Sequence, residues 1–170
     1  MTALTLVPVP LTAERFAPYG DVISTGGAGN EPMNEARFAR YSDLATVDVD
    51  SEGDVAIGIV QSRSPTALPY AFDRVERHPL GSQAFIPLSA FSFVVVVAPP
   101  GESVCAEDLQ AFETNGSQGI NYHRGTWHMP LIAQAEGQRF LVVDRAPGDA
   151  NCEEWVFEEP VVLGRSGQPG

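Results

Sequence analysis

Hydrophobic residues fall in short runs along this chain, and most of the runs are rich in valine, isoleucine and phenylalanine. Such runs predict β-strands, because β-branched and aromatic side chains pack well on a pleated surface. Proline and glycine separate the runs and favour turns between them. The clearest strands are expected at residues 55–60, 72–78, 83–88, 91–98 and 140–144.

Helical signals are few. Thr12 is a good N-cap for a short helix that ends near Phe16, and residues 107–109 suggest one further helical turn. The run 91–98 is apolar almost throughout, which is typical of a strand covered on both faces. Many short strands and one or two short helices predict a mainly β fold, either a barrel or a sandwich.

No internal repeat or linker divides the chain, so we expect one domain over residues 1–160. Residues 161–170 are expected to form a flexible C-terminal tail, because most of them offer nothing to bury. Residues 34–41 mix arginine and tyrosine with apolar side chains, and they fit either a solvated strand or the edge of a helix.

Charge and cysteine content narrow the class of protein. The 170 residues carry a formal net charge of −12, and all ten basic residues are arginine. Such an acidic chain does not predict binding to nucleic acid or to an anionic membrane. Two cysteines without paired spacing, no signal-peptide pattern and no apolar run long enough to span a bilayer predict a soluble, cytoplasmic protein.

Two of the three histidines fall in one stretch, residues 119–130, beside a tyrosine, an arginine and a tryptophan. His123 and His128 are five residues apart, so an unbroken strand would point them to opposite faces. A turn at residues 124–125 would reset the phase and let both face one cavity. The alternative is a hairpin in which Trp127 and one histidine are buried while the other residues are solvated.

The third histidine is the last residue of a predicted strand. Glu76 and His78 are two residues apart, so on a strand they share a face. Gln83 comes after a Pro-Leu-Gly turn, and together with a histidine from the later stretch these groups would suit a metal or acid–base site. The alternative is an exposed charge pair at residues 76–77 and a turn histidine before Pro79.

Several segments together resemble the ureidoglycolate lyase family, in that family's order and spacing from about residue 4 to about residue 157. They are Ala17-Pro-Tyr-Gly-Asp-Val-Ile23, Glu76-Arg-His-Pro-Leu-Gly-Ser-Gln-Ala-Phe-Ile-Pro-Leu88, Phe93-Val-Val-Val-Val-Ala98, Asn121-Tyr-His-Arg-Gly-Thr-Trp-His128 and Phe140-Leu-Val-Val-Asp-Arg145. The resemblance implies a cupin-like homodimer of the allantoin branch of purine breakdown. It also implies cleavage of ureidoglycolate to glyoxylate and urea, without an organic cofactor.

Members of this family are cupin-like, and some of them use nickel. The resemblance places residues 76–88 in the first cupin motif and residues 123–128 in the second, which implies that His78, Gln83 and His128 are ligands of a divalent metal. Metal-binding cupins usually have a glutamate where Gln83 stands. A neutral amide at that position is expected to weaken the hold on a metal.

Loss of urea from ureidoglycolate requires a base on the hydroxyl, a proton for the departing nitrogen and a clamp for the carboxylate. The resemblance assigns this chemistry to the titratable groups of the two motifs. The expected catalytic residues are Glu76, His78, His123 and His128. The expected substrate-binding residues are Asn34, Gln83, Tyr122 and Arg124.

Three other functions fit parts of the pattern. An amidohydrolase would release ammonia from the same substrate. A metal-dependent dioxygenase or sugar isomerase would share the cupin fold, although Gln83 is a poor ligand for redox iron. A non-catalytic module would only bind a small acid. The chain has no nucleophile elbow, phosphate-binding loop or dinucleotide fingerprint, so the sequence does not support covalent catalysis.

Overall fold

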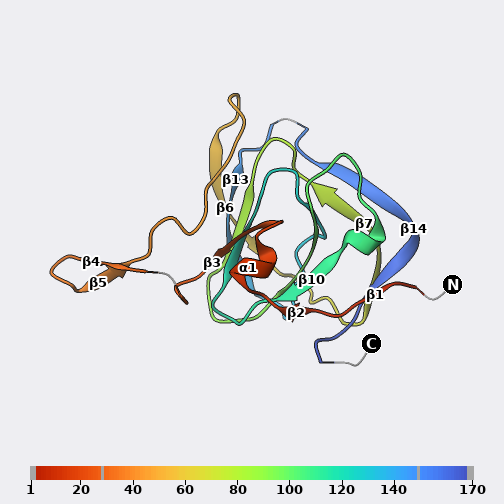
Figure 1. Ribbon diagram of the computed structural model, residues 1–170, viewed down its shortest axis with the longest axis horizontal. Helices are drawn as coiled ribbons and strands as arrows, with labels where there is room; N and C mark the ends of the chain where they lie inside the picture. The colour runs from red at the N-terminus through yellow and green to blue at the C-terminus, as the bar shows by residue number, and fades with distance from the viewer. Residues whose placement is uncertain (1–2, 28, 149, 168–170) are drawn as a thin grey trace.

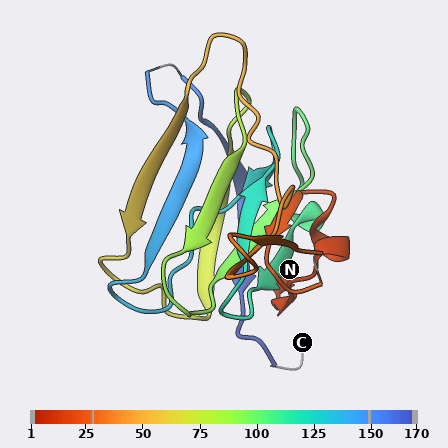
Figure 2. The ribbon, with the colours of Figure 1, turned by 90° about the vertical axis from the view of Figure 1, so that its left-hand side faces the viewer.

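The computed structural model describes residues 3–27, 29–148 and 150–167, and nearly all of its regular structure is β. The larger sheet contains, from edge to edge, β1 (Thr5–Leu6), β14 (Glu153–Leu163), β7 (Tyr70–Arg77), β12 (Trp127–His128), β9 (Val94–Ala98), β10 (Gln110–Glu113) and β2 (Val9–Pro10). The smaller sheet contains β3 (Gly20–Ile23), β11 (Gly119–Tyr122), β8 (Gln83–Pro87), β13 (Arg139–Arg145) and β6 (Val55–Gln61). The two sheets curl around a common interior (Figures 1 and 2). This arrangement confirms the predicted mainly β, cupin-like fold.

The interior between the sheets is apolar because alternate residues of each strand point into it. Val95 and Val97 of β9 belong to one buried cluster with Phe85, Phe140 and Val142 of the smaller sheet. The other β9 residues belong to a second buried cluster on the opposite face of the larger sheet, with Val94, Val96, Ala98, Trp127 and Leu109 among its members. Strand β9 is therefore buried on both faces, as its continuous apolar run predicted.

The predicted strands are all present, with shifted ends. Strand β9 begins at Val94 and not at Phe91. Thr12 caps helix α1 (Ala13–Phe16), where its hydroxyl accepts a hydrogen bond from the Arg15 backbone N–H at 3.2 Å. The second helical turn is a 3₁₀ helix, η1 (Ala106–Asp108), one residue earlier than expected.

Strands β10 and β14 of the larger sheet were missing from the sequence prediction. Strand β10 is short, and β14 contains Pro160 and many acidic residues, so neither has a clear hydrophobic run. Strand β14 breaks register against β7 between Val156 and Val161. It then continues to Leu163, which is fully buried, so residues 161–163 belong to the strand and not to the expected tail. Residues 168–170 of that tail lie outside the described residues.

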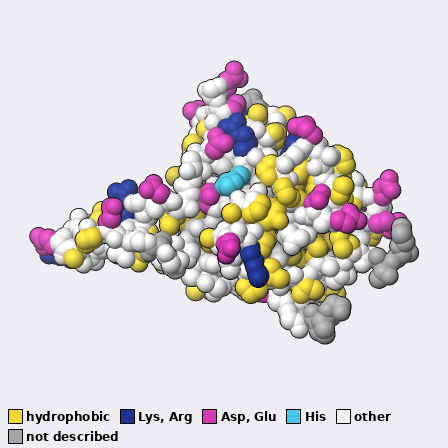
Figure 3. All heavy atoms as spheres, viewed as in Figure 1, with side chains coloured by type: hydrophobic (Ala, Val, Ile, Leu, Met, Phe, Trp, Pro, Cys, Tyr) yellow, Lys and Arg dark blue, Asp and Glu magenta, His cyan; other side chains and the backbone are white. Residues whose placement is uncertain are grey.

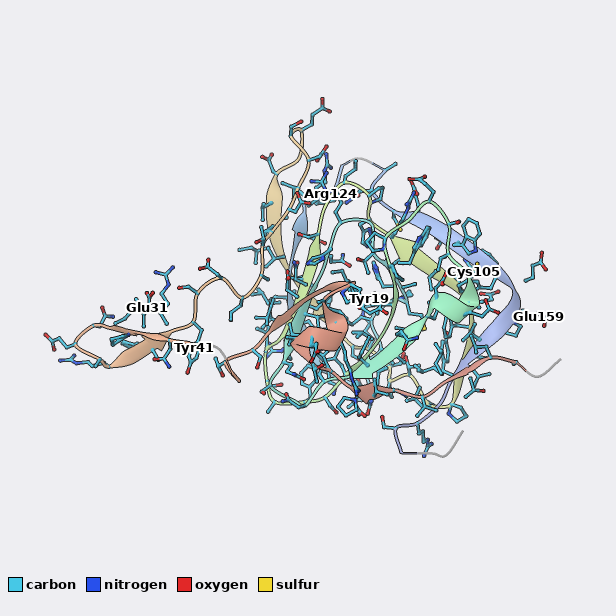
Figure 4. The ribbon with its side chains drawn as sticks, in the orientation of Figure 1. Tyr19, Glu31, Tyr41, Cys105, Arg124 and Glu159 are labelled. Atoms are coloured by element: carbon cyan, nitrogen blue, oxygen red, sulfur yellow. The ribbon has the colours of Figure 1, made fainter. Side chains whose placement is uncertain are left out.

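Residues 31–40 form a hairpin that projects from the body, as Glu31 and Tyr41 show in Figure 4. Its strands are β4 (Glu31–Met33) and β5 (Phe38–Arg40), which decides between the two predicted forms of residues 34–41 in favour of a solvated strand. The turn between them has positive φ at Asn34, Glu35 and Ala36. Within the part of the chain that the structure covers, no helix is long and apolar enough to cross a membrane.

Truncating Phe140 should strongly destabilise the fold. This ring is 1% exposed and makes edge contacts with Phe85, Phe91 and Phe93. Phe140→Ala is expected to lower the free energy of unfolding by about 3–5 kcal/mol, because it removes buried surface and leaves a cavity. Urea denaturation measures the change. Val156→Ala, at a side chain that is 56% exposed, is the control and should change the same quantity by less than about 0.5 kcal/mol.

Candidate active site

The apolar interior ends in a row of polar side chains at one end of the smaller sheet. On β13, Phe140 and Val142 are buried between the sheets, and Asp144 is the next residue on that face. Strands β8 and β11 repeat this change from apolar to polar. Gln83 precedes the buried Phe85 on the same face, and Tyr122 lies opposite Gln83 in the β8–β11 register. The strand alternation therefore carries three polar side chains toward the larger sheet.

The larger sheet contributes a carboxylate and an imidazole at the facing position. Glu76 of β7 lies directly opposite His128 of β12 in the strand register, and Glu76 Oε1 lies 3.6 Å from His128 Nε2. The ring of His78, just after β7, lies with its centroid 5.1 Å from that of His128. Tyr122 stacks on His128 at 4.3 Å between ring centroids. The expected shared face of Glu76 and His78 is thus present.

Backbone carbonyls determine which ring nitrogens of the two histidines are free. His128 Nδ1 lies 2.9 Å from the Thr126 carbonyl oxygen, and His78 Nδ1 lies 2.6 Å from the Asn151 carbonyl oxygen. A carbonyl oxygen only accepts hydrogen bonds, so each Nδ1 carries the proton and donates it. In the neutral rings, both Nε2 atoms consequently have a free lone pair.

These lone pairs have no partner within the structure. His78 Nε2, His128 Nε2 and the Tyr122 hydroxyl are buried without a hydrogen bond among the described residues. Buried polar atoms are rarely left unpaired, because each costs about 1–3 kcal/mol. A bound ligand that accepts a hydrogen bond from the Tyr122 hydroxyl and donates hydrogen bonds to the two nitrogens would pair all three atoms. A metal ion bound by the two nitrogens would serve them equally well.

The donor set fits a divalent transition metal. Glu76, His78 and His128 each offer one ligand atom, and these atoms lie within 4.8 Å of one another. Neutral imidazole and carboxylate suit such metals, and the carbonyls behind both rings orient them as is usual for metal ligands. The geometry includes Glu76, which the family resemblance did not place among the metal ligands. Gln83 instead donates a hydrogen bond from Nε2 to Asp144 Oδ2 at 3.1 Å.

The protonation states suit proton transfer at neutral pH. The pKa of the Glu76 carboxyl is lowered, chiefly by the His128 ring whose Nε2 lies 3.6 Å away, and burial opposes this effect. Burial lowers the pKa of His78 and favours its neutral ring. Burial also raises the pKa of the Tyr122 hydroxyl well above its usual value, so this group stays a proton-bearing donor.

A cavity of about 220 Å³ adjoins the cluster at His78. It is lined by His78, Gln83, Asp144, Cys152 and neighbouring residues of the loops after β7 and β13. The Cys152 thiol donates a weak hydrogen bond to Glu76 Oε2 at 3.5 Å, which links the cavity wall to the carboxylate. On the face seen in Figure 3, a histidine side chain comes to the surface near the middle of the body. The volume suits a small polar acid.

Three expected site residues lie apart from this cluster. His123 is largely exposed, and its Nε2 lies 3.0 Å from Asp21 Oδ1. The turn predicted at residues 124–125 is present, with Gly125 at φ +77°, but it buries only His128 inside the barrel. Arg124, labelled in Figure 4, already forms a two-point ion pair with Asp48. Asn34 lies at the tip of the projecting hairpin.

Sequence reasoning missed two residues that build the site. Asp144 stands two residues after Val142, so the alternation along a predicted strand would have placed it on the inner face. Asn151 holds His78 from behind through its backbone oxygen, while its side chain accepts a hydrogen bond from the Leu80 N–H at 2.7 Å. No sequence pattern could predict that Asn151 orients His78, because this contact uses a backbone carbonyl, which every residue has.

Fold and site together define a cupin-like β-barrel protein with two imidazoles and a carboxylate at the mouth of its interior. The chain belongs to the ureidoglycolate lyase family, whose profile matches residues 3–164. It is 46% identical over 155 residues to a ureidoglycolate lyase of Stutzerimonas stutzeri, covering 91% of both chains. It is 47% identical over 155 residues to one of Pseudomonas aeruginosa, covering 91% of this chain and 92% of that one.

Among solved structures, the chain is similar to a TDP-fucose-3,4-ketoisomerase from Campylobacter jejuni. That likeness has 9% identity and a TM-score of 0.40, and it covers 78% of this chain and 86% of the other. So low a score supports no conclusion about fold or function.

Acid should destabilise the metal-free protein through His78. Its pKa is lower in the folded protein than in the unfolded chain, where it is about 6.5, so the unfolded chain takes up the proton first. The stability that His78 contributes is therefore complete above about pH 6.5 and is lost as the pH falls through the folded pKa. Urea denaturation between pH 8 and pH 5, with chelator present, should show stability decreasing toward acid. His78→Gln should flatten this decrease, and an equal slope in that variant would contradict the assignment.

Proposed function

We propose that this protein cleaves ureidoglycolate to glyoxylate and urea, as a step in allantoin breakdown. The observation that carries the proposal is the cluster of Glu76, His78 and His128, in which both imidazole Nε2 atoms lack a hydrogen-bond partner among the described residues. Membership in the ureidoglycolate lyase family supports the same substrate. Two free, exposed cysteines are consistent with a reducing compartment, so we place the reaction in the cytoplasm.

The reaction breaks the bond between the hydroxyl-bearing carbon and the ureido nitrogen. The hydroxyl loses its proton, its oxygen becomes the aldehyde oxygen of glyoxylate, and the departing nitrogen of urea takes up a proton. An enzyme accelerates this step by accepting the first proton, supplying the second and holding the carboxylate in place.

Glu76 is the base in this proposal, because it is the one carboxylate of the three-residue cluster and is ionised at neutral pH. Tyr122 keeps its proton and donates a hydrogen bond to the substrate from a fully buried position. His78 and His128 present Nε2 lone pairs, which accept hydrogen bonds from O–H or N–H groups of the substrate, on rings that the carbonyls of residues 126 and 151 hold fixed. His123 lies outside this set, since its ring pairs with Asp21.

The same three residues, Glu76, His78 and His128, would hold a divalent metal, and nickel is the metal that the family resemblance suggests. A bound metal would act as a Lewis acid toward the hydroxyl and carboxylate oxygens of the substrate. Gln83 as an additional ligand stays a prediction, since its amide nitrogen is engaged with Asp144.

A homodimer is the second part of the proposal. The outer face of β6 and β13 is apolar, because Ile57 pairs with Val143 and Ile59 with Leu141 across the two strands. Ile57 is 74% exposed and Ile59 is 62% exposed, and contiguous apolar patches of this kind usually mark contact surfaces. The projecting hairpin would extend along a second subunit, which is the arrangement that could bring Asn34 near a substrate.

In the deciding experiment, purified protein is incubated with racemic ureidoglycolate. Glyoxylate, urea and ammonia are quantified and compared with the amounts formed by uncatalysed decay of the substrate. We expect glyoxylate and urea in equal amounts. Glyoxylate with ammonia would instead make the protein an amidohydrolase, and no acceleration would favour a module that only binds small acids. A parallel arm with chelator, followed by addition of nickel, determines whether the reaction needs a metal.

Two variants test the assigned groups. His128→Ala should lower kcat/KM for ureidoglycolate at least about tenfold, and Tyr122→Phe should lower it roughly ten- to a hundredfold, because one preorganised donor is lost. Tyr19→Phe is the matched control, since Tyr19 is also buried against the same aromatic cluster. Circular dichroism monitors folding. Near-normal turnover in Tyr122→Phe would remove that hydroxyl from the site.

Light scattering after size exclusion tests the dimer. The native protein is expected to have twice the mass of one chain. The double variant Ile57→Lys with Ile59→Lys should be monomeric at the same concentration, because it buries charge in the proposed interface. Val156→Lys changes an exposed apolar residue on the other sheet and should leave the dimer intact. A native monomer would refute this part of the proposal.

A further inference from the structure

The Asp144 carboxylate lies on the inner face of the barrel, and the proposed proton transfers do not use it. It follows Phe140 and Val142 on alternate positions of β13, and both of those side chains are buried between the sheets. An acidic residue on such a face is costly unless it is partnered or in contact with a ligand. Asp144 lines the cavity of about 220 Å³ together with His78 and Gln83.

Its one hydrogen-bond partner among the residues that the structure describes is Gln83, whose Nε2 donates to Asp144 Oδ2 at 3.1 Å. An ionised carboxylate only accepts hydrogen bonds, so the amide must turn its nitrogen toward Asp144. Each residue then keeps an acceptor that this bond does not use, namely Asp144 Oδ1 and Gln83 Oε1. No ion pair of Asp144 occurs in the described ranges, and the neighbouring Arg145 pairs with Asp50 at 2.6 Å.

The cavity therefore presents acceptors on one side and the imidazole of His78 on another. A substrate that fills it needs N–H donors at the Asp144 end. The ureido group ends in an NH₂, which carries two such donors, whereas an acyl group of the same shape ends in a methyl group and carries none. Sites built to hydrogen-bond an N–H group reject analogues that lack it, because the buried acceptors are left unpaired.

We propose that Asp144, positioned by Gln83, is the residue that recognises the terminal NH₂ of the ureido group. The inference rests on the proposed function and deepens it, since it names the residue that separates ureido acids from acyl-amino acids. Asp144 is a specificity residue in this proposal and takes no part in moving protons.

The probes for the test are N-carbamoylglycine and N-acetylglycine. Both keep the carboxylate, the amide N–H and the carbonyl, and both lack the hydroxyl, so neither can undergo the elimination. They differ only in NH₂ against CH₃. Titration calorimetry on the full-length protein should show that the wild type binds N-carbamoylglycine about tenfold more tightly, or better.

Substitution of Asp144 should remove the preference without removing binding. In Asp144→Leu the two dissociation constants should lie within about threefold of each other, since the loss falls on N-carbamoylglycine alone. Asp144→Asn keeps one acceptor oxygen and should give an intermediate ratio. Asp54→Leu, at an exposed acidic residue before β6, is the matched control and should keep the wild-type ratio.

The outcomes separate this inference from the proposed function. A wild type that binds both probes equally or binds neither, or an Asp144→Leu protein of native circular dichroism that keeps the preference, would overturn the role of Asp144. Ureidoglycolate turnover would stand in that case. Conversely, a clear preference for N-carbamoylglycine that depends on Asp144 would support the inference even if the turnover assay failed.

Discussion

The register between β12 and β7 places His128 opposite Glu76, and the site depends on this pairing. A shift by one residue would turn both side chains to the other face of the sheet, where Trp127 and Val75 are packed. The register is held because β12 lies between β7 and the fully buried β9. Packing on both faces of β9 thus positions a carboxylate and an imidazole for chemistry.

Two backbone carbonyl groups also hold the imidazoles of His78 and His128 in one orientation. The carbonyls of Thr126 and Asn151 fix the Nδ1 protons and leave the Nε2 atoms free. The stack of Tyr122 on His128 limits rotation of both rings. Unpaired buried nitrogens cost stability, and the aromatic core between the sheets offsets that cost. The result is a site that is organised before a ligand arrives.

The loop of residues 46–54 adds a further layer of support. Asp48 exchanges hydrogen bonds with Ser82 through the Asp48 N–H and carbonyl, and its carboxylate engages Arg124. Asp50 pairs with the buried Arg145 beside Asp144. These contacts tie the first motif, the second motif and strand β13 to one loop. Arg124 and Arg145 therefore both hold this loop in place, and Arg145 also lines the cavity.

The sequence by itself determined the β class, the strands with strong apolar runs and the segments that supply the site, because strand periodicity and motif composition are local properties. Glu76 and His78 were correctly placed on one face for that reason. Only the tertiary structure decided that His128 enters the cluster while His123 does not, since β11 and β12 belong to different sheets. It likewise brought Asp144 to Gln83 and exposed the β6 face. Both depend on which strands become neighbours, and strand order is set by packing across the whole chain.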